Sequence, residues 1–138
     1  MPTISPGCNA SDNQWQNTCR DPNFSWRATD PNGDDGSGVD QYAYAWNTSS
    51  SDNPSTWGDA TSHDPSAITN ADGVARYYLH VKAKDVAGNT SSVNTFGLWY
   101  DGSLPTATIS INDDASTTNQ TTIRLGLTTG DTGSGVAD

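Results

Sequence analysis

The chain has 138 residues with 16 acidic and 6 basic side chains, which is the length of one domain or of one domain plus part of another. Every acidic residue is an aspartate, and Asp, Asn, Ser, Thr and Gly together make up 75 of the residues. Because these residue types favour turns, caps and strand edges over helix interiors, the composition excludes a helical fold. The formal charge of −10 argues against nucleic acid and anionic membrane surfaces as partners, since both would repel the chain.

The apolar content predicts a small core that is rich in aromatic residues. Leu, Ile, Val and Phe number only 18, and 5 Trp and 5 Tyr supply the remaining large apolar side chains. The apolar runs are three or four residues long, far short of the roughly 20 that a membrane-spanning helix needs. We therefore expect no insertion into a membrane.

Seven strand-length segments recur between turn clusters. They are residues 2–5, 23–29, 39–47, 74–85, 93–101, 107–112 and 121–128. In the second segment, Phe24 and Trp26 share one face and Arg27 lies on the other, which is the pattern of a strand with one buried side. In the fourth segment, we expect His80 on the outward, solvent-exposed face. The spacing of these short strands predicts an all-β antiparallel sandwich.

The two cysteines, Cys8 and Cys19, close a short loop of polar residues. Such a pair is more typical of a disulfide than of a metal site, which usually needs four ligands. Disulfides persist in oxidising compartments, so this pair indicates an extracellular or cell-surface location.

An internal repeat organises the chain. The segment GDDGSGVD at residues 33–40 returns as GDTGSGVAD at residues 130–138, 97 positions later, which is the length of one sandwich. We therefore expect one module over residues 1–103 and the linker and opening two strands of a second repeat over residues 104–138. Two strands alone are not stable in water. These residues are then either a truncated repeat or a donor segment that completes a neighbour's sheet.

The order of these motifs resembles a known family. The succession DDGSGVDQYAYAWN, NPSTWGDA, DGVARYYLHVKAKDVAGNTSS and FGLWYDGSLPTATI is similar to the bacterial immunoglobulin-like or fibronectin type III-like repeats of secreted and cell-surface proteins. The resemblance covers about residues 30–108 and restarts at Ile123. It implies an immunoglobulin-like or fibronectin type III-like sandwich and a structural, adhesive spacer whose partners are neighbouring repeats or identical subunits.

Calcium is the metal that the acidic loops favour, because it prefers several carboxylate, amide and backbone oxygens. The predicted sandwich places the loops around residues 30–35 and 85–89 at one end, and it places Asp101 close to Asp131 at the boundary between repeats. The candidate ligands are Asp30, Asp34, Asp35, Asp85, Asn89, Asp101 and Asp131. The alternative is turn chemistry, in which Asp and Asn side chains bond nearby backbone amides.

Sugar binding is a second hypothesis. Trp15, Trp57 and Trp99 fall in loops or at strand ends, where an indole can stack on a pyranose ring while Asp and Asn bind its hydroxyl groups. The alternative is that these side chains fill a core that is short of aliphatic residues. A surface glycan is the corresponding partner.

We expect no enzymatic activity. His63 and His80 have no evident nucleophile as a partner in the sequence, and no GxSxG, phosphate-loop or HExxH motif occurs. The sequence therefore predicts a non-catalytic spacer module. A self-assembling filament subunit and a carbohydrate-binding module are the two alternatives.

Overall fold

The computed structural model describes residues 1–31, 36–68 and 74–137. Within these ranges the chain is all-β, with ten strands and one short 3-10 helix, η2 (Asn112–Asp114). The strands are β1 (Thr3–Pro6), β2 (Gln14–Gln16), β3 (Phe24–Arg27), β4 (Val39–Asn47), β5 (Trp57–Gly58), β6 (Ser62–His63), β7 (Val74–Asp85), β8 (Asn94–Asp101), β9 (Thr106–Ile111) and β10 (Leu125–Gly130). No helix of the described residues is long and apolar enough to cross a membrane.

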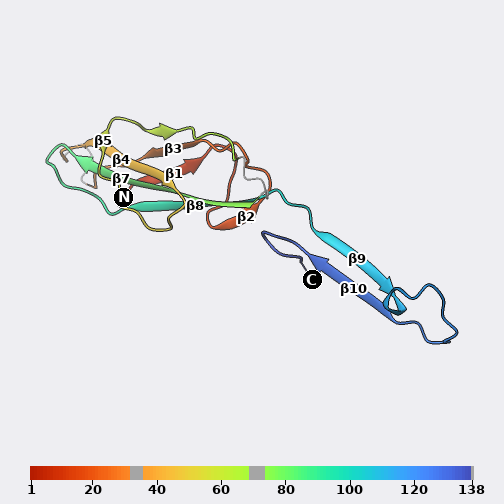
Figure 1. Ribbon diagram of the computed structural model, residues 1–138. Helices are drawn as coiled ribbons and strands as arrows, with labels where there is room; N and C mark the ends of the chain where they lie inside the picture. Colours follow the sequence, from red (N-terminus) through yellow and green to blue (C-terminus); the bar gives the residue numbers. More distant parts are fainter. Residues whose placement is uncertain (32–35, 69–73, 138) are drawn as a thin grey trace.

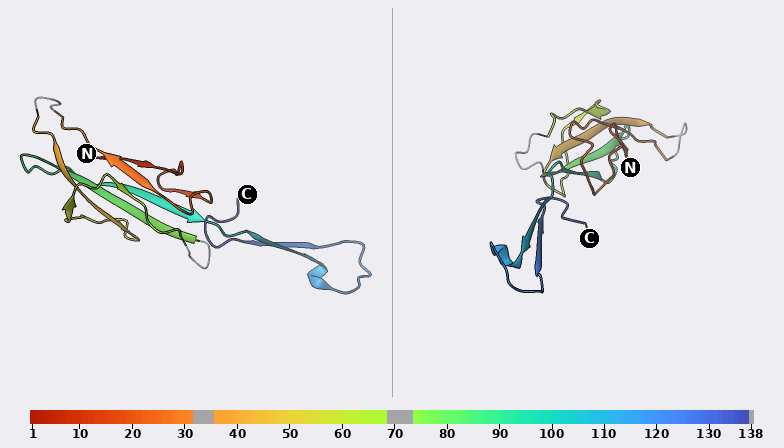
Figure 2. Two further views of the ribbon diagram at one scale, coloured as in Figure 1. Left: turned by 90° about the horizontal axis from the view of Figure 1, so that it is seen from above. Right: turned by 90° about the vertical axis from the view of Figure 1, so that its right-hand side faces the viewer.

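The strands form three sheets (Figure 1). One has the order β1-β3-β6 and a second, larger one has the order β2-β8-β7-β4-β5. These two sheets pack together, and we call residues 1–103 the sandwich. The third sheet contains only β9 and β10, an antiparallel pair that we call the hairpin. Figures 1 and 2 show the hairpin projecting away from the sandwich, so that the chain is elongated.

The core lies between the two sheets of the sandwich. Phe24 and Trp26 from β3 are 2% and 3% exposed, whereas Ser25 and Arg27 between and after them are exposed, as the alternation predicts. Phe24 packs against Phe96 of β8 with ring centroids 5.6 Å apart. The inward residues of the long strands complete the core, namely Leu79, Val81, Leu98 and Tyr100, with the partly buried Tyr42, Tyr44, Trp46 and Tyr77. The predicted aromatic core is confirmed.

The predicted disulfide joins Cys8 and Cys19, whose Cα atoms are 5.7 Å apart. The loop that it closes lies along the edge of the larger sheet. There, β2 pairs with β8 in parallel, and the N–H of Gly97 donates to Oδ1 of Asp12 at 2.7 Å. The sequence pattern did not predict β2, because a strand of three residues is too short to show alternation and forms only through its neighbour in the sheet.

The prediction that His80 faces solvent is wrong. His80 does point to the outer face of the larger sheet, but it is fully buried. Its Nε2 lies 3.0 Å from the carbonyl oxygen of Ser49 and its Nδ1 lies 2.9 Å from the hydroxyl of Thr95. The loop that follows β4 covers this face, since Asn53 also accepts a hydrogen bond from Lys82. A strand pattern shows which face a residue occupies and not what covers that face.

The hairpin has one polar and one apolar face. Thr108 pairs with Thr128 and Ser110 with Gly126 on the polar face. The apolar face carries the pairs Ile111–Leu125 and Ile109–Leu127, and these four side chains are 51% to 72% exposed. Nothing among the described residues covers this face.

Candidate functional site

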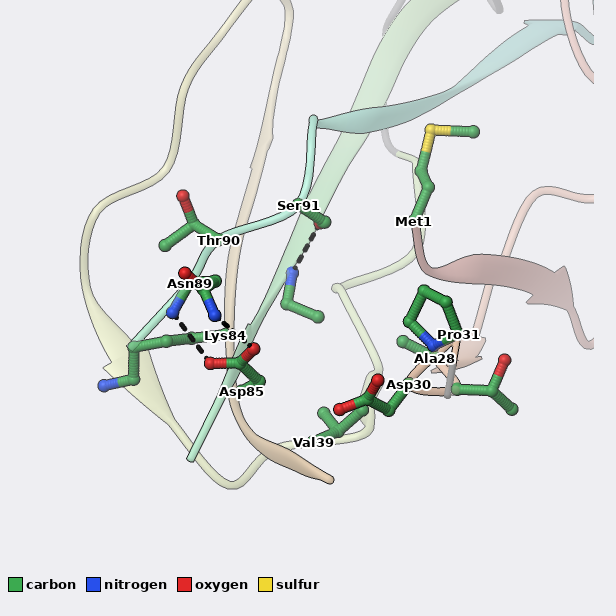
Figure 3. Close-up of a pocket in the computed structure, with 12 residues that line it drawn as sticks. Met1, Ala28, Asp30, Pro31, Val39, Lys84, Asp85, Asn89, Thr90 and Ser91 are labelled. Atoms are coloured by element: carbon green, nitrogen blue, oxygen red, sulfur yellow. Dashed lines mark hydrogen bonds between the residues drawn. The ribbon is translucent and has the colours of Figure 1, made fainter. Parts of the chain in front are cut away.

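The loops at one end of the sandwich bring together three of the predicted calcium ligands. Asp30, Asp85 and Asn89 line one pocket of about 380 Å³ (Figure 3). Asp85 is turned toward Asn89: its Oδ1 accepts the backbone N–H of Asn89 at 2.7 Å and its Oδ2 accepts the side-chain amide at 2.8 Å. The side-chain hydrogen bond from Asn89 is the main cause of the lowered pKa of Asp85.

Turn chemistry therefore accounts for the groups at this end. Oδ2 of Asp30 accepts the N–H of Gly38 at 3.1 Å, so both carboxylates bond to their own loops. The predicted ligands Asp34 and Asp35 lie outside the described residues. In the part of the chain that the structure describes, no three His, Cys, Asp or Glu residues are grouped so that they could hold a metal ion. Calcium binding at this end stays a prediction.

A second acidic group lies where the sandwich meets the hairpin. Asp101 ends β8 and is 7% exposed. Its Oδ2 accepts the backbone N–H of Ser134 at 2.6 Å, and its Oδ1 accepts the backbone N–H of Ser103 at 2.9 Å. These bonds, chiefly the one from Ser134, lower the pKa of Asp101 to about 2. The carboxylate thus ties the end of the sandwich to a loop 33 residues further along the chain.

The loop after β10 packs against the carboxylate of Asp101. Oδ2 of Asp131 accepts the backbone N–H groups of Gly133 at 3.3 Å and of Gly135 at 2.8 Å. The carboxylate of Asp101 occupies the space that a Cβ on Gly133 would need. Gly135 has a φ of +84°, which a residue with a side chain rarely adopts. We call the contact of Asp101 with residues 133–135 the clasp.

The same type of contact occurs within the sandwich. There, the carboxylate of Asp30 lies against Gly36, as Asp101 lies against Gly133, and Gly38 has a φ of +78°. An aspartate carboxylate therefore packs against each of the two GSG segments, residues 36–38 and 133–135. The first aspartate comes from the same loop and the second from the preceding sandwich. The repeat in the sequence predicted two equivalent loops but did not predict these acceptors, which lie at unrelated positions in the two copies.

The predicted approach of Asp101 and Asp131 is observed, in a pocket of about 310 Å³ at the junction. Trp15 and Asn17 from the disulfide loop also line this pocket. Gln16, another lining residue, has a buried side-chain nitrogen with no hydrogen-bond partner among the described residues. The pocket thus combines one indole, two carboxylates and amide groups.

The three tryptophans predicted to bind sugar all lie on the outer face of the larger sheet, but at opposite ends. Trp15 pairs with Trp99 across β2 and β8, and the guanidinium carbon of Arg76 lies 4.7 Å and 4.6 Å from their two ring centroids. Trp57 is distant in the sheet, on β5, where Lys82 and Lys84 each place an ammonium nitrogen 5.1 Å from its ring centroid. The three indoles therefore do not form one platform.

A further pocket, which the sequence did not predict, lies beside the core. It has a volume of about 500 Å³ and is lined by Trp46, His63 and Tyr77, among others. Trp46 and Tyr77 stack with ring centroids 5.2 Å apart. His63 packs on Tyr44 at 5.1 Å, so its ring is part of an aromatic cluster.

Comparisons with known proteins found no match to a family model, to a curated protein or to a solved structure.

Proposed function

We propose that the chain is a non-catalytic structural and adhesive spacer of an extracellular or cell-surface protein that is built from repeats. The clasp is the observation that carries this proposal. A rigid spacer fixes the positions of the modules that it joins, and this requires junctions that hold a defined angle. Two hydrogen bonds join the end of the sandwich to the loop after β10 at this junction. The backbone N–H of Ser134 donates to Asp101, and the hydroxyl of Thr132 donates to the hydroxyl of Ser103 at 3.2 Å.

The strand order supports an immunoglobulin-like or fibronectin type III-like fold for the sandwich. The smaller sheet has the order β1-β3-β6, and in the larger sheet the strands β5, β4, β7 and β8 lie side by side in that order. In the immunoglobulin-type division, the first, second, fourth and fifth strands form one sheet and the third, sixth and seventh form the other. The observed order fits this division except that the smaller sheet of the described residues has no counterpart of the fourth strand. The disulfide supports the extracellular setting.

The proposal is tested by a distance measurement across the junction. Spin labels at Asp59→Cys and Thr118→Cys, both at exposed positions on opposite sides of the junction, report the distance by electron–electron double resonance. The labelled chain is diluted with unlabelled chain so that only distances within one molecule contribute. We expect a narrow distribution that broadens in Asp101→Ala, because that variant loses the acceptor of both backbone bonds.

Asp113→Ala is the matched control. Asp113 is an aspartate of the C-terminal part that is exposed, unlike Asp101, and it bonds to Arg124 at the far end of the hairpin and not at the junction. We expect the control to keep the narrow distribution. A wild-type distribution as broad as that of Asp101→Ala would overturn the spacer proposal.

Calcium is expected to add little at this junction, since both carboxylates already accept backbone N–H groups. A site with the millimolar affinity of many extracellular modules would raise the melting temperature by only about 2 °C at millimolar calcium. A larger rise that Asp101→Asn or Asp131→Asn abolishes would instead identify the junction as a calcium site.

A second candidate function is recognition of a saccharide in the junction pocket. The observation that favours it is the convergence of Trp15 with Asp101, Asp131 and the unpartnered nitrogen of Gln16. Aromatic stacking with a few convergent polar groups is the usual composition of a sugar site. Trp15→Ala is expected to abolish binding on a glycan array and Trp57→Ala to retain it, because Trp57 lies far from this pocket. Equal binding by both variants would reject the site.

A further inference from the structure

The junction pocket carries a negative charge that neither the spacer role nor the saccharide site explains. This is the pocket of about 310 Å³ where the disulfide loop meets the loop after β10, and Asp101 and Asp131 both line it. None of its lining residues is basic. The ion pairs of the described residues lie elsewhere, so neither of the two carboxylates has a basic partner among these residues.

One of the two carboxylates keeps an oxygen that can accept a bond from a ligand. The backbone N–H groups of Gly133 and Gly135 both donate to Oδ2 of Asp131. Oδ1 of Asp131 accepts no hydrogen bond from the described residues, and this residue is half-buried. Asp101, in contrast, uses both oxygens to accept backbone N–H groups. A cationic ligand can therefore bond to Asp131 while Asp101 attracts it from nearby.

The charge of Asp101 persists over the ordinary pH range. The bond from the backbone N–H of Ser134 is the main cause that lowers the pKa of Asp101 to about 2, so this carboxyl group is ionised above about pH 4. It is also only 7% exposed. A buried carboxylate that has no basic partner stabilises a positive charge placed beside it more than an exposed carboxylate does, because water screens it less.

The disulfide loop adds an aromatic ring and amide groups to the lining, through Trp15, Gln16 and Asn17. An indole attracts the apolar face of a sugar ring and also attracts a cation. The guanidinium carbon of Arg76 already lies 4.7 Å from the ring centroid of Trp15, although Arg76 is not part of the lining. Nε2 of Gln16 lacks a partner among the described residues, and a hydroxyl oxygen is an acceptor that it can use. The pocket thus offers partners for hydroxyl groups as well as for positive charge.

The charge of the whole chain and the size of the pocket select the same kind of ligand. A formal charge of −10 raises the local concentration of cationic ligands, with a range of about 10 Å at 0.1 M salt. The volume of about 310 Å³ is at the lower limit for ligand sites, which fits one small ring better than a folded partner. A rigid sugar ring also loses less conformational freedom against an indole than a lysine side chain does.

We propose that the junction pocket binds a saccharide that carries a free amino group, with the ammonium on Oδ1 of Asp131 and the sugar ring against Trp15. This inference rests on the second candidate function, the saccharide site, and goes beyond it by naming the charge of the ligand. The ammonium group bonds to the carboxylate, and the hydroxyl groups of the ring bond to the amide groups of the disulfide loop. A basic peptide is the alternative ligand that the test separates from an amino sugar.

Two oligosaccharides that differ only in the substituent on nitrogen test the proposal. A glucosamine tetramer carries ammonium groups at about pH 6, whereas an N-acetylglucosamine tetramer carries neutral acetamide groups. Titrations of the full chain, followed by the amide signals of residues 131–135 and the indole signal of Trp15, give the two dissociation constants. We expect the glucosamine tetramer to bind on the order of 10-fold more tightly at about 50 mM salt, and this preference to decrease as salt is added.

Asp131→Asn and Asp113→Asn form a matched pair of variants. Each removes one negative charge from the C-terminal part of the chain, but only Asp131 lines the pocket, whereas Asp113 lies at the tip of the hairpin. We expect Asp131→Asn to lose most of the preference for the charged tetramer and Asp113→Asn to keep it within about twofold. The amide signals of Gly133 and Gly135 show whether the loop keeps its structure in Asp131→Asn, since an asparagine oxygen can still accept their N–H groups.

The outcomes separate this inference from the saccharide function. Equal binding of the two tetramers, lost in Trp15→Ala, would overturn the role of the amino group and leave the saccharide site intact. No binding of either tetramer would reject the saccharide site and this inference together. A lysine tetrapeptide that binds as tightly as the glucosamine tetramer would overturn the assignment to a sugar and identify a basic peptide as the ligand. An unchanged preference in Asp131→Asn would show only general attraction to an acidic chain and would also overturn the proposal.

Discussion

The pair β1–β3 and the pair β9–β10 alternate apolar and polar side chains in the same way, but only β1–β3 buries its apolar side. Each is an antiparallel pair with one apolar and one polar side, and each leads toward a loop that contains GSG. The inward residues of β3 are almost fully buried, whereas those of β10 are more than half exposed. The alternation of side chains therefore decides which face is apolar, and the presence of a second layer decides whether that face contributes to stability.

The largest expected difference between the two pairs is the cost of removing one apolar side chain. Phe24→Ala is expected to lower the free energy of unfolding by about 3–5 kcal/mol, because Phe24 is 2% exposed and contacts Trp46 and Phe96. Leu127→Ala, at 72% exposure, is expected to change it by less than about 0.5 kcal/mol in dilute solution. Denaturant unfolding followed by backbone amide signals measures both regions. Similar costs for the two variants would contradict the comparison.

The disulfide gives the next largest effect. Replacement of Cys8 and Cys19 by serine is expected to cost about 2–4 kcal/mol, because the open loop gains conformational entropy in the unfolded chain. The loss is expected to be confined to the sandwich, with the hairpin amide signals unchanged. A reduced protein that unfolds at the same denaturant concentration as the oxidised one would show that the loop contributes nothing.

A substitution at His80 tests whether this residue anchors the loop after β4 to the outer face of the larger sheet. His80→Leu fills a similar space but leaves the carbonyl of Ser49 and the hydroxyl of Thr95 without a ring nitrogen. We expect a loss of about 1–3 kcal/mol. Faster amide exchange in residues 48–53 would accompany it. His63→Leu is the comparison variant, since no hydrogen bond of His63 holds that loop. An unchanged stability in His80→Leu would mean that the loop is not anchored there.

The contribution of the clasp depends on pH. The pKa of Asp101 is lowered from 3.8 to about 2, so the charged form is the one that the loop binds. A depressed pKa in the folded state means that the clasp contributes fully above about pH 4 and is lost as the pH falls through about 2. The amide shift of Ser134 is expected to titrate with a midpoint near 2. A midpoint near 3.8, the ordinary value for this carboxyl, would show that the bonds do not form.

Long alternating segments were predicted well from the sequence. The bounds of β4 and β7 agree with the predicted residues 39–47 and 74–85, since a run of nine or twelve residues carries enough alternation to define a strand. The strands β2, β5 and β6 were not predicted. Each has only two or three residues and is defined by the strand beside it. No local pattern in the sequence records such a neighbour.

The candidate site was predicted in part for the same reason. Acidic loops and their common position in a sandwich predicted that Asp30 lies near Asp85 and that Asp101 lies near Asp131, and the structure places each pair in one pocket. The sequence could not show that backbone N–H groups would take these carboxylates, because Asp101 and Ser134 are 33 residues apart. Composition favoured a metal ion as the ligand, whereas the geometry shows hydrogen bonds to the loops.

Native-state hydrogen exchange tests the comparison most directly. It shows whether the second layer, and not the alternation of side chains, makes the pair β1–β3 more stable than the pair β9–β10. We expect the ladder amides of β1 and β3 to exchange only through global unfolding and those of β9 and β10 to exchange through local opening, with much lower protection. Equal protection of both pairs would show that the hairpin is stable without a second layer, and would contradict this explanation.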